Sequence, residues 1–272
     1  TSTNKDSVSD IQAIVTKANT ALALIEEYNN GDGTTVLTST TATNKTVLTK
    51  ADYEAVGVTG VSDTVVDTGV EGTDNLAAVN AQVLLSNQGA ADTVAKIQSL
   101  VSAGNDAITY VTGTVANEIG TLDASTGTLS EQAQLDAYAA AGITGVSADN
   151  LLAVNAQLRL ETTATNKDSV SDIQAIVTKA NVAIALIEEY NNGDGTTVLT
   201  NTTATNQTVL TKADYEAVGI TGVSDTTVDA GTSTDGTDNL AAVNAQVLLS
   251  NQGEANTVAK IQSLVTAGND AI

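Results

Sequence analysis

The chain has 272 residues, of which 42% are hydrophobic and 2% aromatic, and it contains no Cys, His, Pro, Met, Trp or Phe. Its 32 acidic and ten basic residues give a formal charge of -22, so a nucleic acid or an anionic membrane would approach against a repulsive field. The lack of Cys excludes disulfides, and the scarcity of bulky side chains favours several small cores over one large core.

The sequence repeats itself. Residues 3–69 return as 165–231 with seven substitutions, and residues 72–108 return as 236–272 with three. A degraded copy lies between them, which gives an elementary unit of roughly 75 to 90 residues, the size of one small domain. Tandem arrays of this kind usually serve to span a distance and not to catalyse a reaction.

The first predicted element is a long helix of about 20 residues that begins after Asp6, and further copies begin after Asp92 and Asp168. A carboxylate at this place can accept backbone N–H groups and faces the positive end of the helix dipole. We therefore predict these three Asp as N-caps. The apolar stripe that indicates the first helix is Val8, Ile11, Val15, Ala18, Leu22 and Ile25.

A shorter helix is predicted over 49–56, 132–141 and 211–218. Each copy is followed by a glycine and then an apolar residue, which is typical of a helix stop with glycine in the left-handed conformation. The Thr-Gly-Val-Ser string that follows is predicted to be a turn. The three glycines are Gly57, Gly142 and Gly219.

A third helix is predicted to begin near Asn75, Asn150 and Asn239. Three amphipathic helices with short connections predict an all-α fold of tandem three-helix bundles that form an elongated array. A periodic chain can also be divided with the long helix first, but boundaries favour the longer polar stretches. The predicted parts are the last helix of a truncated module at 1–28, modules at 47–111, 129–190 and 209–272, and linkers at 29–46, 112–128 and 191–208.

Two side-chain types recur inside the helices. The Asn of each Ala-Val-Asn-Ala-Gln string is predicted to hydrogen-bond a neighbouring turn and fix helix register, although a polar recognition face is the alternative. Tyr53, Tyr138 and Tyr215 occupy one equivalent place before the glycine stop. We expect their rings to close the end of the bundle while the hydroxyl reaches water.

Catalytic chemistry is not expected. Without His and Cys, the commonest general base, the thiol nucleophile and the usual zinc ligands are missing. The acidic pairs at Glu26 and Glu27 and at Glu188 and Glu189 are predicted to be solvated surface charges. The sequence therefore predicts no enzyme, no catalytic residues and no cofactor.

One string suggests a metal. Asn-Asn-Gly-Asp-Gly begins at Asn29 and again at Asn191, but Tyr28 and Ser39 stand where a calcium loop needs its two strongest carboxylates. A turn after a helix explains the string without an ion, so no metal site is predicted. Calcium binding by these loops stays an open alternative, with Asn30, Asp32, Asn192 and Asp194 as its ligands.

Neither a signal peptide nor a membrane span is apparent in the sequence. Ile272 falls inside a predicted helix, which suggests that the chain is part of a longer one.

The repeated strings resemble those of very large adhesins on the surface of Gram-negative bacteria. Two that carry this resemblance are Tyr-Ala-Ala-Ala-Gly-Ile-Thr-Gly-Val-Ser from Tyr138 and Asp-Thr-Val-Ala-Lys-Ile-Gln-Ser-Leu-Val from Asp92. The resemblance implies an extracellular, cell-surface stalk of repeats that contact their neighbours in the chain and hold a binding region for a host or surface ligand away from the cell. Many such stalks use calcium-stiffened β-sandwiches, so calcium dependence is not carried over to this helical sequence.

A weaker resemblance is to the three-helix albumin-binding modules of Gram-positive surface proteins. It is carried by the turn at Gly60, Val61 and Ser62 and by the helix start at Thr93 and Val94. Function cannot be taken from fold alone, so a protein-binding module and an S-layer component remain alternatives to a structural spacer. A binding module would need exposed aromatic or Arg anchors, and only Arg159 and six Tyr are available.

Overall fold

The computed structural model describes residues 7–29, 46–63, 74–115, 129–163, 166–191, 209–225 and 238–272. These residues are mostly helical and include no β-strand, which confirms the all-α class. The chain forms two compact units. Unit 1 comprises Thr1–Glu118, Thr128–Thr144 and Ala164–Ile173, and unit 2 comprises Ile119–Gly127, Gly145–Thr163 and Gln174–Ile272.

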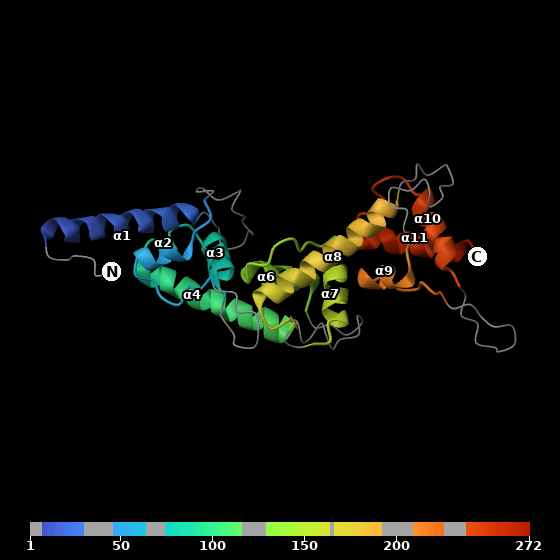
Figure 1. Ribbon diagram of the computed structural model, residues 1–272, viewed down its shortest axis with the longest axis horizontal. Helices are drawn as coiled ribbons and strands as arrows, with labels where there is room; N and C mark the ends of the chain where they lie inside the picture. The colour runs from blue at the N-terminus through green and yellow to red at the C-terminus, as the bar shows by residue number, and fades with distance from the viewer. Residues whose placement is uncertain are drawn as a thin grey trace. The chain divides into compact units, whose positions relative to one another are not determined.

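The helices follow one another in the predicted order (Figure 1). Unit 1 contains α1 (Val8–Tyr28), α2 (Lys50–Ala55), α3 (Leu76–Leu85), α4 (Val94–Thr109), the π-helix η1 (Tyr110–Val115) and α6 (Glu131–Ala140). Unit 2 contains α7 (Leu151–Leu160), α9 (Lys212–Ala217), α10 (Leu240–Leu249) and α11 (Val258–Asp270). The long helix α8 (Val170–Tyr190) has its first four residues in unit 1 and the others in unit 2.

The long helices begin at a hydroxyl residue, and the prediction of Asp92 as an N-cap is wrong. Thr93 is extended, with φ of -139°, and its side chain accepts a hydrogen bond from the backbone N–H of Lys96. Asp92 lies one residue too early for this role, because the cap must reach the second or third helical N–H. It instead forms an ion pair with Lys96 at 2.8 Å.

The same correction applies to Asp168, because Ser169 Oγ accepts the bond from Asp172 N at 3.2 Å. At α1 the cap is Ser7, which forms a reciprocal capping box with Asp10. Asp6 lies outside the described residues.

The predicted glycine stops are confirmed in all three copies. The φ angles are 83° at Gly57, 74° at Gly142 and 78° at Gly219, a region that L side chains rarely adopt. In each copy the N–H of the next apolar residue bonds back to the carbonyl of the tyrosine, at 3.1 Å in the first. This is the bond pattern of a Schellman stop.

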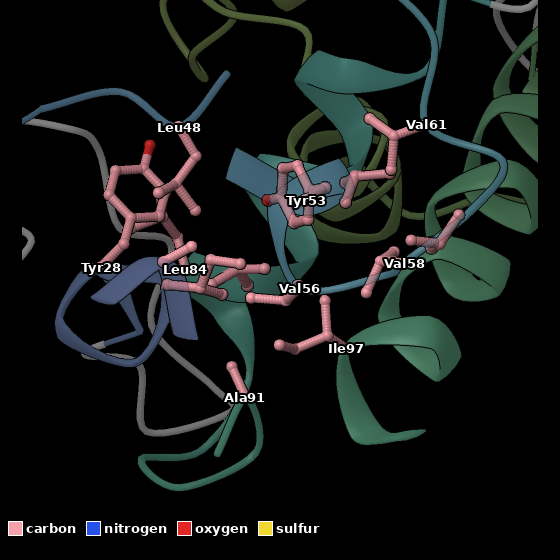
Figure 2. Packing of buried hydrophobic residues seen from close by; sticks show 14 residues of the cluster. Tyr28, Leu48, Tyr53, Val56, Val58, Val61, Leu84, Ala91 and Ile97 are labelled. Atoms are coloured by element: carbon pink, nitrogen blue, oxygen red, sulfur yellow. The ribbon is translucent and has the colours of Figure 1, made fainter. Parts of the chain in front are cut away.

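The core of unit 1 joins four helical segments. Figure 2 shows side chains from the end of α1, from α2, from α3 and from the start of α4 pointing toward one another. The bulkiest are fully buried: Tyr28, Tyr53, Ile25, Leu48 and Ile97. Burial of one such aliphatic side chain contributes about 1.5–3 kcal/mol.

Unit 2 has a corresponding set of buried residues. The end of α8, the start and end of α9, and the facing sides of α10 and α11 contribute them. The buried set is Ile187, Tyr190, Leu210, Tyr215, Val218, Ile220, Val243, Val247, Ile261 and Val265.

Within unit 1 the two ends of one long helix meet different partners. α4 packs on α3, and α4 and its extension η1 also contact α6. Val111 in η1 is fully buried and stands where α1 has Ile25. A long helix therefore contributes to a core at each of its ends.

The predicted module boundaries stay predictions. The core that includes Tyr53 and Ile97 also takes in Ala21, Ile25 and Tyr28, which the predicted boundary at 28 assigns to another module. Packing thus crosses that boundary in unit 1.

Candidate functional site

The described residues hold no group of three or more acidic side chains that could bind a metal ion. Glu26, Glu27, Glu188 and Glu189 are exposed, as predicted for surface charges.

One described helix, α8, is long and apolar enough by length and composition to cross a membrane, and 33% of its apolar window is buried within the protein. Length and composition alone do not distinguish a membrane span from a packed helix. Within this helix, Ile176, Val177 and Ala180 are buried in the protein.

The first residue of each candidate calcium string holds two helices together. Asn29 Nδ2 donates to the carbonyl oxygens of Val83 at 2.6 Å and Ser86 at 3.2 Å, and Gly89 N donates to Asn29 Oδ1 at 3.0 Å. Asn191 donates in the same way to Val247 and Ser250. These side chains therefore bind the C-terminal ends of α3 and α10. The candidate ligands Asn30, Asp32, Asn192 and Asp194 lie outside the described residues.

A buried polar pair stands at the centre of the first core. Tyr53 OH donates to Asn80 Oδ1 at 2.6 Å, and Asn80 Nδ2 donates to Leu48 O at 2.9 Å. Tyr215, Asn244 and Leu210 O repeat this arrangement in unit 2. At both places the Asn bonds a neighbouring element, as predicted, but its partners are the short helix and the segment just before it and not a turn.

The expectation that the tyrosine hydroxyls reach water is wrong. Tyr53, Tyr138 and Tyr215 are buried, because the helix that carries the Asn covers the ring and its hydroxyl in the two copies just described. Burial raises the pKa of Tyr53 well above its ordinary value of 10.0, and the nearby Tyr28 and Asp52 add to the rise. The pKa of Tyr215 is raised in the same way.

A second polar cluster ties the turn to the third and long helices. Asn75 Oδ1 accepts from Ser62 N at 2.8 Å, while Asn75 Nδ2 donates to Gly60 O and to Asn105 Oδ1, both at 2.7 Å. Asn150 makes the corresponding bonds with Ser147, Gly145 and Asn181, and Asn239 pairs with Ser224, Gly222 and Asn269. The same hydrogen-bonded Asn cluster therefore connects the turn, the third helix and the long helix in three repeats.

Successive repeats meet at a third contact, which we call the joint. In unit 1, Gln82 Nε2 of α3 donates to Ala140 O of α6 at 2.9 Å. A Cβ at Gly142 would lie 2.7 Å from Ala78 N, so α6 packs its glycine on the backbone of α3. Helix packing this close requires a residue without a side chain.

Unit 2 contains a matching joint between α7 and α9. Gln157 Nε2 donates to Ala217 O at 2.6 Å, and a Cβ at Gly219 would lie 2.9 Å from Leu152 O. The third helix of one repeat therefore contacts the short helix of the next in both units.

Sequence reasoning missed the joint. It interpreted Gly142 and Gly219 only as helix stops, and it gave no role to the Gln that ends each Ala-Val-Asn-Ala-Gln string. The recurrence of Gln82, Gln157 and Gln246 was the available signal.

The chain matches no protein-family model, no curated protein and no solved structure. Its resemblance to adhesin repeats therefore stays a prediction.

Proposed function

We propose that this chain is a structural spacer, a stalk of tandem three-helix bundles in an extracellular bacterial adhesin that holds a binding region away from the cell surface. Its partners are neighbouring repeats of the same chain. It works through length and stiffness, and it has no catalytic role.

The joint carries this proposal. A flexible string of domains needs no contact between neighbours, whereas here α6 packs on α3 and α9 on α7 through the same glycine and the same Gln side chain. Direct packing at each joint limits bending independently of the polar linkers. In repeat arrays such nearest-neighbour interfaces supply the cooperativity and the shape.

The placement of the tyrosines supports a spacer over a binding module. Five of the six are buried in the helical cores, and Tyr110 alone is substantially exposed, at 40%. Binding surfaces concentrate their energy in exposed aromatic and Arg anchors. Because five of the six aromatic rings are buried in the cores, few exposed aromatic anchors remain for the albumin-binding alternative.

Small-angle scattering of a lengthened chain tests the proposal. Residues 29–190 inserted after Tyr190 add two elementary repeats without altering a junction, because 191–199 repeat 29–37. A helix of about 20 residues is about 30 Å long, so a stalk should lengthen by about 60 Å. Millimolar calcium should leave both lengths unchanged.

A compact assembly would instead grow only with about the 0.38 power of residue number, and that result would overturn the spacer. Extension that appears only with calcium would make the Asn-Asn-Gly-Asp-Gly loops regulated joints. Saturable binding of serum albumin by the purified chain would favour the binding module.

A further inference from the structure

The first repeat presents an unoccupied joint. Gly57 corresponds to Gly142 and Gly219, yet no described atom lies within 4 Å of a Cβ built there. Ala55, which corresponds to the hydrogen-bonded Ala140 and Ala217, lines a hollow of about 940 Å³ between α1 and α2. None of the described residues fills here the space that α3 and α7 fill at the later joints.

The first half of α1 is largely exposed, although the same apolar residues are buried in α8. Residues 7–19 and 169–181 are identical. In α1, Ile11 is 52% and Val15 45% exposed, whereas the corresponding Ile173 and Val177 of α8 are fully buried. Because the two sequences are the same, the difference arises only from what packs on them.

The chain itself shows what covers this face. In α4 the corresponding side is packed by α3: Asn105 pairs with Asn75, and a Cβ at Gly104 would lie 3.1 Å from Val79 N. In unit 2, Asn181 of α8 pairs with Asn150 at the start of α7.

α1 retains the groups that this contact needs. Asn19 stands where Asn105 and Asn181 stand, and Ala18 stands where Gly104 allows close approach. Gln12 stands at the place of Gln98, which bonds both the N–H and the carbonyl of Thr59 in the turn before α3. α1 therefore carries both the apolar and the polar side chains that this contact uses.

We propose that the exposed face of α1, with the hollow beside Ala55 and the open side of Gly57, binds a third helix of the repeat type together with its Thr-Gly-Val-Ser turn, supplied ahead of α1 in the same polypeptide. The α7 helix with its preceding turn is the pattern of this partner. Its Asn150 would pair with Asn19, and its Gln157 would donate to Ala55 O.

The partner is placed in the same polypeptide because a third helix reaches its long helix through a short link. Residues 86–93 connect α3 with α4, and residues 161–169 connect α7 with α8. The inference rests on the repeat architecture of the proposed function. It identifies the exposed face of α1 as the surface on which a preceding repeat packs.

Hydrogen exchange on a lengthened chain tests the inference. Residues 129–162 are fused directly ahead of Thr1, which reproduces the natural junction because 163–166 and 1–4 both read Thr-X-Thr-Asn. In the original chain the amides of 8–19 should exchange faster than those of 170–181, although their intrinsic rates are equal. The fusion should slow the amides of 8–19 by about tenfold or more. Peptides that extend to Thr20 or Val182 differ in mass and separate the two copies.

A scrambled extension of the same composition is the control, and it should leave exchange in α1 unchanged. Protection by the scrambled extension, or no protection by the native one, would overturn the inference. So would concentration-dependent dimerisation of the original chain that protects α1, because a second copy would then be the occupant.

The substitution Gly57→Ala provides an independent readout. In the original chain it should lower the melting temperature only by the cost of Ala at positive φ, and so less than Gly142→Ala does, whereas in the lengthened chain it should lower it as much as Gly142→Ala does. Equal effects of Gly57→Ala in both chains would contradict docking at Gly57. Protection of α1 in a chain that scattering finds compact would defeat the stalk and leave this inference standing.

Discussion

The buried bond between Tyr53 and Asn80 illustrates how single residues specify this fold. An apolar core of Ala, Val, Leu and Ile packs in several registers at similar free energy, whereas a phenol at 2.6 Å from an amide oxygen fits only one. Asn80 also donates to Leu48 O, so moving its side chain away would leave this carbonyl oxygen without its donor. Register is therefore fixed by polar groups inside an otherwise aliphatic core.

The substitution Tyr53→Phe tests this bond. It keeps the ring and leaves Asn80 Oδ1 buried without a donor, so we expect a loss of about 1–3 kcal/mol in the free energy of unfolding of that core. Urea denaturation followed by circular dichroism measures it. The matched control Tyr110→Phe, at a 40% exposed ring, should change stability by less than about 0.5 kcal/mol. Equal effects would refute a special role for the buried hydroxyl.

Alkaline pH should unfold the protein through the same tyrosines. Burial raises the pKa of Tyr53 and Tyr215 in the folded state, so above the ordinary value of 10.0 the unfolded chain releases protons that the folded chain retains. The contribution of these tyrosines to the free energy of unfolding is therefore fully present below about pH 10 and falls as the pH rises further. Helical ellipticity and tyrosinate absorbance should change together. Ionisation of these tyrosines with helicity intact would contradict the assignment.

At the scale of elements, the same glycine performs two tasks. It terminates the short helix through its positive φ, and at Gly142 and Gly219 it also lets the backbone of another helix approach. Gly57 performs only the first task. The chain thus contains its own comparison between helix termination and helix packing.

Gly142→Ala should therefore destabilise more than Gly57→Ala. Both place Ala at positive φ, which costs about 1–2 kcal/mol, but only at Gly142 does the new methyl group overlap the backbone near Ala78. Overpacking of this kind adds about 1–3 kcal/mol. Thermal melts of the two variants provide the measurement. A cost at Gly57 as large as at Gly142 would show that packing at the joint is not limiting.

At the scale of the whole molecule, charge opposes folding. The formal charge is -22, and the ion pairs among the described residues, such as Lys96 with Asp92 and Lys212 with Glu216, are solvent-exposed. Exposed pairs contribute about 0–1 kcal/mol each, which does not offset the repulsion among the excess carboxylates.

Salt should consequently stabilise the protein. Raising NaCl from about 10 to about 150 mM shortens the Debye length from about 30 to about 8 Å, which screens the repulsion, so the melting temperature should rise. Calcium chloride at matched ionic strength should produce a similar rise if the loops bind no ion. A melting temperature that falls with NaCl would mean that attractive pairs dominate.

The sequence by itself determined the helices, because the three-and-four spacing of Val and Ile, the glycine stops and the repeat are local signals. It also located the polar residues at helix interfaces, since Asn recurs beside each apolar stripe. It misplaced the N-caps by one residue, because Asp and the following Ser or Thr both suit a cap and only backbone geometry separates them.

Only the tertiary structure decided where the tyrosine hydroxyls lie and which glycines touch another helix. Both depend on residues far apart in the chain, such as Asn80 with Tyr53 and Ala78 with Gly142. The clearest case is the pair of identical segments 7–19 and 169–181, which is largely exposed in α1, whereas in α8 its apolar residues Ile173, Ile176, Val177 and Ala180 are buried. The same residues have the same helical preference in both places, and burial differs because it is a property of the neighbours that pack on them.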